Sequence, residues 1–329
     1  MSEGKEQKVI KWGIIGCGDV TEVKSGPAYQ QTDGFEIVAV MRRDLDKARD
    51  YAERHGVARY YGDADALIAD PEVDAVYIAT PPDVHLHYAK KVAAAGKPCC
   101  IEKPLAPSYA ESKAIVEAFK EKGLPLFVAY YRRSLPRFTQ VKSWIDAGKV
   151  GTVRHISWHY SKGPSDQDQS KEYNWRTDPV VAPGGYFDDL ASHGLDLFAY
   201  LLGEMKDVSG ISLNQQGLYG AKDAFAASWL HTSTVTGTGS WNFGTFGYED
   251  SVKIYGSLGT ISFSVFDEQP VVLETAEGRQ ALEIAHPGAV QLHHVQDMRD
   301  HLAGQGTHPS LGESGAHTSW VMDRILGVH

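Results

Sequence analysis

The sequence predicts an α/β protein in which a doubly wound parallel sheet is followed by an α+β domain with a large, mostly antiparallel open sheet. Up to residue 129, short apolar runs alternate with segments of helical spacing, the pattern of parallel strands joined by crossover helices. From Val208 to Ile284, strands rich in Thr, Ser, Val and aromatic residues follow one another without helices, which is typical of antiparallel sheets. We therefore expect two domains, at residues 1–129 and 130–329.

Composition sets the broad class of the protein. The 329 residues are 42% hydrophobic and 22% charged, enough for two domains with proper cores. A formal net charge of -10 disfavours a nucleic-acid or anionic-membrane surface. Residues 1–8 are polar and Lys11 interrupts the apolar run that follows, so we expect neither a signal peptide nor a membrane span, and a cytoplasmic location. Cys17, Cys99 and Cys100 have no C-x-x-C spacing, so neither a disulfide nor a metal site is predicted.

A glycine turn follows the first expected strand, Val9 to Ile15. Gly16 would allow a tight turn, and Gly18 would let the backbone approach a pyrophosphate at the start of the next helix. The third position of this fingerprint, usually Gly or Ala, is Thr21. The pattern is weak by itself, because a glycine turn also simply joins two elements. The candidate nucleotide-binding residues here are Gly16, Gly18, Asp19 and Val20.

Two arginines follow the second expected strand, Phe35 to Met41, before a helix predicted from Asp44 to Gly56. A cofactor with free ribose hydroxyls would favour Asp or Glu there, but Arg42 and Arg43 suit a 2'-phosphate, by bidentate hydrogen bonding and stacking on adenine. The pair therefore predicts NADP, with NAD also possible. The plain alternative is a solvated basic pair at a strand end.

The third expected strand, Val73 to Ala79, ends at Thr80 and Pro81, at what should be the ligand-binding edge of the sheet. A helix is predicted from Val84 to Ala95. His85, just inside it, could approach the nicotinamide half of a dinucleotide or could only pack or cap the helix.

The fourth strand leads directly to a lysine. Cys99 to Ile101 is a short apolar run, followed by Glu102, Lys103 and Pro104. Pro104 removes a backbone donor, so the strand should end there and hold Lys103 at its exit. Glu102 and Lys103 are candidate cofactor contacts, and Lys103 is also a candidate catalytic residue. The remaining expected elements of this sheet are a helix over residues 108–122 and a strand over residues 124–129.

After residue 129 the alternation of apolar strands and helices ends. A helix is expected from Tyr130 to about Ala147 and a half-buried strand from Val153 to Tyr160. The polar loop Ser161 to Pro183 is too long for a plain connector, and loops of that length are often functional. It carries Trp175 and Arg176.

A second chemical stretch follows Gly184-Gly185. Asp189, His193 and Asp196 are four and three residues apart, so helical spacing would place them on one face. A carboxylate could then fix the imidazole tautomer while the other ring nitrogen meets a substrate hydroxyl. Alternatively, Asp188 and Asp189 are first-turn carboxylates favoured by the helix dipole and His193 is satisfied in the core. The spacing favours Asp189 over Asp188.

Together these separated motifs resemble those of the Gfo/Idh/MocA oxidoreductase family over nearly the whole chain. The resemblance implies an amino-terminal Rossmann domain, and a carboxy-terminal domain whose sheet often forms homodimers or homotetramers. It also implies reversible hydride transfer between NAD(P) and a carbohydrate, ketosugar or cyclic polyol, with Lys103, Asp189 and His193 as catalytic residues. The motifs that carry it are Gly16-x-Gly18, Glu102-Lys103-Pro104, Tyr131-Arg132, Trp175-Arg176 and the run from Gly184 to Asp196.

The hypothesis is that His193 exchanges the proton of a sugar hydroxyl while Lys103 stabilises the developing alkoxide. Two alternatives stay open: a redox-neutral glycoside-cleaving enzyme with retained dinucleotide, and a dinucleotide-binding regulatory protein without turnover. No pattern selects one sugar or the reaction direction. The candidate substrate contacts are Tyr131, Arg132, Trp175, Arg176, Asp189 and His193.

Overall fold

The computed structural model describes residues 9–328, and the chain forms two compact units. The first contains Met1–Ala106, Ala110–Tyr131 and Pro287–Glu313, and the second contains Pro107–Tyr109, Arg132–His286 and Ser314–His329. The units differ from the ranges expected from the sequence chiefly at Pro287–Glu313, which lies beyond residue 130 but belongs to the first unit.

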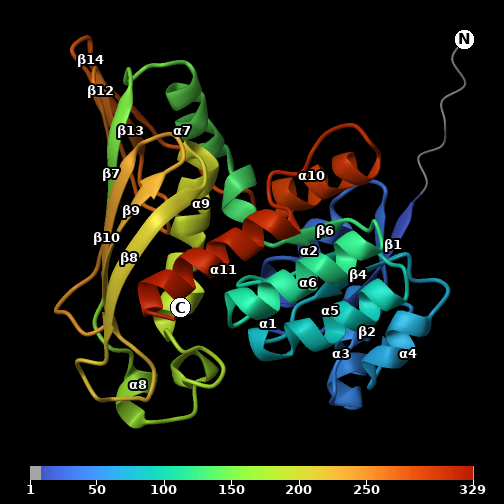
Figure 1. The fold of residues 1–329 in the computed structure, drawn as a ribbon. Coiled ribbons are helices and arrows are strands. Elements are labelled where there is room, and N and C mark those ends of the chain that lie inside the picture. Colours follow the sequence, from blue (N-terminus) through green and yellow to red (C-terminus); the bar gives the residue numbers. More distant parts are fainter. Residues whose placement is uncertain (1–8, 329) are drawn as a thin grey trace, which may run out of the picture. The chain divides into compact units, whose positions relative to one another are not determined.

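The first unit is built on the predicted parallel sheet, with six strands in the order β3-β2-β1-β4-β5-β6 (Figure 1). Every neighbouring pair is parallel. The chain passes outward from β1 to β3 and returns on the other side at β4, so the strand order reverses between β1 and β4. The strands are β1 (Ile10–Ile15), β2 (Phe35–Met41), β3 (Arg59–Tyr61), β4 (Ala75–Ile78), β5 (Cys99–Ile101) and β6 (Leu126–Val128). Of the strands in this sheet, only β3, which has three residues, was not predicted from the sequence.

Helices connect these strands, as the alternating pattern predicts. The predicted helix after β2 is confirmed as α3: the Asp44 side chain accepts a hydrogen bond from the Lys47 amide at its start, and Gly56 ends it with φ 67°. The helices and 3-10 turns of this part are α1 (Asp19–Val23), α2 (Gly26–Gln30), α3 (Leu45–His55), α4 (Ala64–Ala69), η1 (Pro82–Val84), α5 (His85–Ala94), α6 (Tyr109–Glu121) and α10 (Leu292–Leu302).

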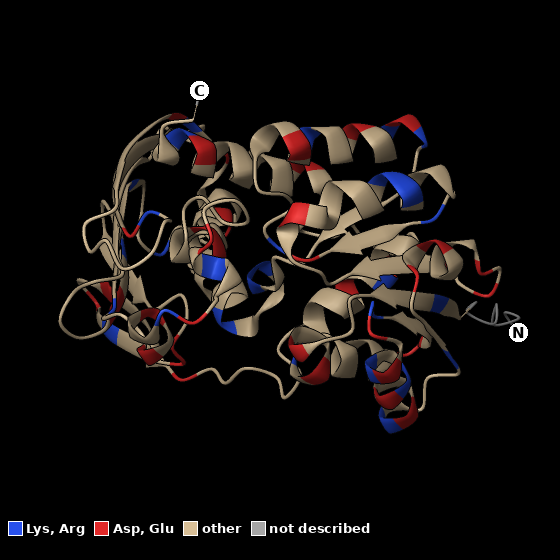
Figure 2. Cartoon of the chain, turned by 90° about the horizontal axis from the view of Figure 1, so that it is seen from below, with Lys and Arg blue, Asp and Glu red and all other residues tan. Residues whose placement is uncertain are grey.

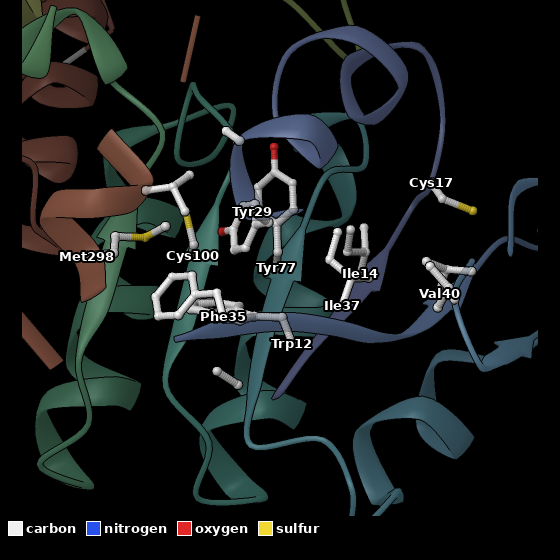
Figure 3. Packing of buried hydrophobic residues seen from close by; sticks show 14 of the residues in the cluster. Trp12, Ile14, Cys17, Tyr29, Phe35, Ile37, Val40, Tyr77, Cys100 and Met298 are labelled. Atoms are coloured by element: carbon white, nitrogen blue, oxygen red, sulfur yellow. The ribbon is translucent and has the colours of Figure 1, made fainter. Parts of the chain in front are cut away.

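The core of the first unit explains why the segment Pro287–Glu313, near the end of the chain, belongs to this unit. Trp12 and Tyr29 are fully buried, with ring centroids 4.9 Å apart. Met298 of α10 is also fully buried and packs in the same cluster, where Figure 3 shows it beside Cys100. Burying a side chain of this size contributes about 1.5–3 kcal/mol. Ser310 extends the attachment, since its carbonyl accepts a hydrogen bond from the Val128 amide.

The second unit is built on an eight-stranded sheet in the order β14-β13-β12-β11-β7-β10-β9-β8 (Figure 1). Only the β7–β10 pair is parallel, so the predicted mostly antiparallel sheet is confirmed. The strands are β7 (Val153–Ser161), β8 (Met205–Leu213), β9 (Ala224–His231), β10 (Thr236–Asn242), β11 (Glu249–Gly256), β12 (Gly259–Phe263), β13 (Val271–Thr275) and β14 (Gly278–Leu282). Assembly through this sheet stays a prediction.

One face of this sheet is covered by the segment that carries the candidate acid–base residues. Trp158 of β7 packs against Phe198, with ring centroids 5.4 Å apart, and a Cβ on Gly194 would lie 2.3 Å from the Trp158 ring. The helix expected from Tyr130 instead begins as the 3-10 turn η2 (Tyr131–Ser134), and its α-helical part starts at Pro136. The remaining helices are α7 (Pro136–Asp146), α8 (Asp166–Ser170), the 3-10 turn η3 (Trp175–Thr177), the π-helix η4 (Phe187–Ala191), α9 (Ser192–Leu202) and α11 (Gly312–Leu326).

Charged residues of both signs are interspersed along the helices in the view of Figure 2. Some form ion pairs on the surface of the first unit, such as Lys91–Asp65 and Arg54–Glu22, each at 2.6 Å. Between residues 9 and 328, no helix combines the length and the apolar character that crossing a bilayer would require.

Candidate functional site

The glycine turn after β1 needs glycine at its first position. Gly16 has φ +95°, and a Cβ there would lie 2.8 Å from Thr80 Cγ2. The amides of Gly16 and Cys17 both donate to the Met41 carbonyl, at 2.9 and 3.2 Å, which holds the turn against the end of β2. The predicted strand, turn and helix therefore form with the expected local geometry.

Thr21, which departs from the usual fingerprint, closes the turn through its side chain. Its hydroxyl accepts a hydrogen bond from the Gly18 amide at 2.9 Å and donates one to the Gly18 carbonyl at 2.7 Å. Thr21 is fully buried. A Cβ on Gly18 would meet only the Gly16 carbonyl, at 4.0 Å, so the backbone of Gly18 has open space beside it. Thr21 thus organises the turn from inside while Gly18 keeps it accessible.

Arg42 lies beside this turn. Its Nη1 donates a hydrogen bond to the Cys17 carbonyl at 3.2 Å, and the side chain is half-buried. Arg43 is exposed. A guanidinium anchored by one nitrogen keeps its other donors available for a phosphate. Of the two arginines, Arg42 therefore has the more defined position relative to the glycine turn.

The loop after β4 contributes a hydroxyl and a histidine. The Thr80 hydroxyl is buried and makes no hydrogen bond to any residue from 9 to 328. His85 is fully buried, with Nε2 2.8 Å from the Thr80 carbonyl and Nδ1 3.1 Å from the Leu105 carbonyl. Burial lowers the pKa of His85, which favours the neutral ring. A neutral ring has one N–H and donates to one of these two carbonyls, so the contacts describe a histidine packed between two loops, and its contact with a nicotinamide stays a prediction. Pro81 is exposed.

Glu102 is tied to the interior of the first unit. Its Oε1 accepts hydrogen bonds from Tyr77 Oη at 2.6 Å and Gln291 Nε2 at 3.0 Å. Its Oε2 accepts the Lys103 amide at 3.1 Å. Glu102 thus orients the backbone from which the Lys103 side chain leaves the sheet. The Lys103–Pro104 peptide is cis.

These residues of the first unit fit a dinucleotide. The backbone beside Gly18 is open, the Thr80 hydroxyl has no partner among residues 9–328, and Arg42 is held at the turn. Phosphate and ribose groups accept such donors. Gly16 and Gly18 would let a pyrophosphate approach the turn, Thr80 would donate its hydroxyl to it, and Arg42 would lie toward the ribose end.

In the second unit, the candidate acid–base residues lie where a π-helix continues into an α-helix. Asp189 is in η4, and its Oδ2 accepts a hydrogen bond from Arg176 Nε at 2.8 Å. Arg176 lies over the Trp175 ring, 4.5 Å from its centroid. His193 is in the first turn of α9, buried, with its ring centroid 6.1 Å from that of Phe266. Three of the sequence-predicted residues, Trp175, Arg176 and Asp189, are thus brought into one cluster.

Asp188 has different surroundings from Asp189. It is buried, and its Oδ2 accepts the Gly184 amide at 2.8 Å. Its Oδ1 makes no hydrogen bond within residues 9–328. Burial raises the pKa of this carboxyl to about 7, with a smaller contribution from Asp323. Asp188 therefore supports the turn before η4.

The Asp196 carboxylate is engaged by an arginine, and its action on His193 stays a prediction. The Asp196 side chain is fully buried and accepts hydrogen bonds from Arg133 at 2.7 and 2.8 Å. Thr318 Oγ1 donates to the same carboxylate at 3.1 Å. The arginine takes both carboxylate oxygens. This buried ion pair is a structural element.

The two remaining predicted substrate contacts are buried. Tyr131 is 7% and Arg132 is 6% exposed. Arg132 Nε donates to the Val265 carbonyl at 3.0 Å, and its guanidinium lies over the Phe266 ring, 4.6 Å from the centroid. Arg132 therefore supports the segment that carries Phe266, and contact of either residue with a substrate stays a prediction.

Sequence analysis missed Lys162 and Tyr186. Lys162 Nζ lies 4.0 Å from the centroid of the Tyr186 ring. Tyr186 Oη donates to Asp168 at 2.7 Å and accepts a hydrogen bond from Asn174 at 3.0 Å. The available signal was the alternation along β7, because Lys162 follows Trp158 and Tyr160 at two-residue spacing just beyond the end of that strand. The strand expected from the sequence ends at Tyr160.

Comparisons with known proteins extend over most of the chain. A model described as an oxidoreductase family with an NAD-binding Rossmann fold matches residues 10–130, and a GFO/IDH/MocA C-terminal domain model matches residues 138–262. An oxidoreductase of Formosa agariphila is 35% identical over 320 residues, covering 97% of this chain and 99% of that protein. The scyllo-inositol 2-dehydrogenase (NAD(+)) of Bacillus subtilis is 28% identical over 283 residues, covering 82% and 78%.

Solved structures agree in fold. Levoglucosan dehydrogenase in complex with NADH has a TM-score of 0.87 with this chain, covering 97% of this chain and 96% of that one, at 22% identity. At this identity the similarity shows the fold alone.

Proposed function

The chain belongs to the Gfo/Idh/MocA oxidoreductase family, and we propose that it is an NADP-preferring enzyme that transfers a hydride to or from a carbohydrate, ketosugar or cyclic polyol. The named activity of a similar protein, the scyllo-inositol 2-dehydrogenase of Bacillus subtilis, supports this substrate class. The observation that carries the proposal in this chain is the position of Arg42 at the glycine turn.

The preference for NADP rests on charge at the end of β2. A 2'-phosphate is an oxyanion, and Arg42 holds donors beside the turn while Arg43 adds a second positive charge. With NAD, a neutral diol would take the same place and would leave these charges without a partner. At the end of β2, where an acidic residue would suit the diol, this chain has arginine.

The reaction needs a base for a hydroxyl proton and a cation for the alkoxide. The nicotinamide, when bound, supplies the hydride acceptor or donor. We assign proton exchange at the hydroxyl to His193, which takes the proton in oxidation and returns it in reduction. Lys103 stabilises the negative charge that develops on that oxygen. Asp189, held by Arg176, orients His193.

The first test is nucleotide binding. The protein is titrated with NADPH and with NADH, following energy transfer from tryptophan, and the titrations are repeated with Arg42→Ala. We expect tighter NADPH binding, and the substitution should weaken it by about 10–100-fold because a charge-assisted phosphate contact is lost. Arg49→Ala removes an exposed arginine of α3 as the matched control. Tighter NADH binding with a silent Arg42→Ala would contradict the NADP preference.

The second test is turnover. Mixing the protein and NADP with polyols and aldoses should produce NADPH absorbance, and His193→Asn should lower kcat by about 10²–10⁴-fold. Lys103→Met should lower kcat while nucleotide binding is retained. Glycoside cleavage without net cofactor reduction would instead favour the redox-neutral enzyme. Retained NADPH binding with no turnover of any sugar would favour a regulatory protein.

A further inference from the structure

Lys162 continues the row of side chains that faces α9 and η4. Alternate residues of a strand point to the same face, and Trp158 and Tyr160 precede Lys162 by four and two positions. Trp158 packs on α9, and Tyr160 shares the Phe266 ring with His193. The Lys162 amide still donates to the Asn242 carbonyl of β10 at 3.0 Å, so the strand pairing extends to this residue.

The Lys162 ammonium is partly desolvated and makes no polar contact of its own. Its Nζ lies over the Tyr186 ring, and forms neither a hydrogen bond nor an ion pair with any described residue. Burial lowers the pKa of Lys162, while the negative charges of Asp168 and Asp189 oppose that shift. An ammonium has three donors, and those of the half-buried Lys162 have no acceptor among the described residues.

The neighbouring carboxylates already have closer partners. Asp189 accepts from Arg176 Nε at 2.8 Å. Asp168 accepts from the Ser165 amide at 2.9 Å, from the Ser165 hydroxyl at 2.7 Å and from Tyr186 Oη at 2.7 Å. Neither carboxylate lies within 4.0 Å of Lys162 as an ion-pair partner.

A second cation in this neighbourhood also has unused donors. Arg176 uses Nε on Asp189, and its terminal nitrogens make no hydrogen bond to the residues that the structure describes. Asn174 links the two cations, because its Nδ2 donates to Oη of Tyr186, the residue under Lys162, at 3.0 Å, and its Oδ1 accepts the Arg176 amide at 3.1 Å. The Arg176 side chain is 40% exposed. A guanidinium fork and an ammonium together are a usual arrangement for binding carboxylate or phosphate oxygens.

Packing alone does not account for this lysine. A cation over an aromatic face contributes about 0.5–2 kcal/mol, and an apolar side chain of the same length would cover Tyr186 without any desolvated charge. The charge is therefore better explained by a ligand that accepts its hydrogen bonds.

We infer that Lys162, with Arg176, is a substrate-binding residue that selects sugars carrying an oxyanion, either a carboxylate or a phosphate. The inference rests on the proposed function, because it places the anionic group on the sugar that this enzyme oxidises or forms. It narrows the substrate class from neutral polyols to sugar acids or sugar phosphates.

The test measures binding of matched anionic and neutral sugars to the full chain saturated with NADPH, by isothermal titration calorimetry. The anionic probes are D-glucuronate, D-galacturonate and D-glucose 6-phosphate, and the neutral probes are D-glucose and D-galactose. We expect at least one anionic probe to bind about tenfold more tightly than its neutral counterpart. Lys162→Met should remove that preference, and Lys162→Arg should retain most of it. Lys206→Met, at an exposed lysine of β8, is the control and should change nothing.

The two classes of anion and the two proposals give separate outcomes. Binding of the uronates alone assigns a carboxylate, and binding of the phosphate ester alone assigns a phosphate. Failure of every anionic probe to bind, or a preference that Lys162→Met leaves unchanged, overturns the inference. If the enzyme turns over neutral sugars and Lys162→Met has no effect, the proposed function stands and only the inference about Lys162 is overturned. Lys162-dependent binding without turnover of any sugar removes the proposed function instead.

Discussion

Asp188 and Asp189 are neighbours in the chain, but their surroundings assign them different tasks. Asp189 is bound by an arginine at the edge of a cluster of polar groups, whereas Asp188 is buried against the Gly184 amide. Two adjacent residues of a helix point in different directions, so one side chain faces the site and the other faces the interior. The aspartate that pairs with Arg176 is therefore the one that we assign to the reaction.

The burial of Asp188 predicts a pH dependence of stability. Because burial raises its pKa to about 7 from an unfolded value near 3.8, the folded state binds the proton more tightly. This contribution is present below about pH 4 and is lost as the pH rises to about 7, at up to about 1.4 kcal/mol per pH unit. Asp188→Asn should remove it, so the variant should be more stable than the parent at pH 8 and similar at pH 4. Urea unfolding at a series of pH values measures this.

The exposed Asp33→Asn is the matched control for this experiment, and its stability should follow that of the parent at every pH. A parallel pH dependence in Asp188→Asn and the parent would show that Asp188 is ionised in the folded protein across this range.

The Arg133–Asp196 ion pair predicts a large loss of stability. Arg133→Met leaves a fully buried carboxylate without its main partner, which should cost about 3–5 kcal/mol. The double variant Arg133→Met/Asp196→Leu removes both charges and should recover most of that loss. Denaturant unfolding of both variants measures the free energies. A loss below about 1 kcal/mol in the single variant would mean that Asp196 becomes protonated or hydrated at little cost.

At the scale of elements, the contact between β7 and α9 depends on a glycine. A Cβ on Gly194 would lie 2.3 Å from the Trp158 ring, and Trp158 is fixed by its hydrogen bond to Asp250 at 2.9 Å. Gly194→Ala should therefore push α9 from the sheet and cost about 1–3 kcal/mol. It should also alter the near-ultraviolet circular dichroism of the tryptophans. Thermal unfolding measures the loss.

Gly306→Ala is the control for this substitution, because an added Cβ meets nothing within 4 Å there. A Gly194→Ala variant as stable as the control would show that Trp158 can move aside.

At the scale of the whole molecule, the first unit depends on residues from near the end of the chain. A chain that ends at His286 lacks Met298 and Val295 from the core, and it lacks the Gln291 side chain that binds Glu102 at 3.0 Å. We expect such a chain to lose most NADPH binding, although every proposed nucleotide contact is retained. Fluorescence titration tests this, with a chain that ends at Leu326 as the control. Unchanged NADPH affinity in the shorter chain would show that residues 1–131 form a sufficient binding unit.

The sequence by itself determined five of the six strands of the first sheet, the glycine turn and the strand end before Lys103, and it predicted Asp189 and His193 as candidate site residues. These depend on local periodicity, turn residues and strand ends, which are properties of neighbouring residues. It also indicated the family, because its motifs are short and keep their spacing. The predicted parallel sheet and the mostly antiparallel sheet are both confirmed.

Only the tertiary structure decided which side chains meet across long separations. Asp196 pairs with Arg133, 63 residues away, and Gln291 reaches Glu102 across 189 residues. The π-helical form of the turn before α9 was also not predicted from the sequence. Periodicity cannot report such contacts, since two positions with identical local patterns differ only in what packs against them. For this reason the sequence located the candidate acid–base residues, whereas the tertiary structure paired Asp196 with Arg133 and placed Lys162 over Tyr186.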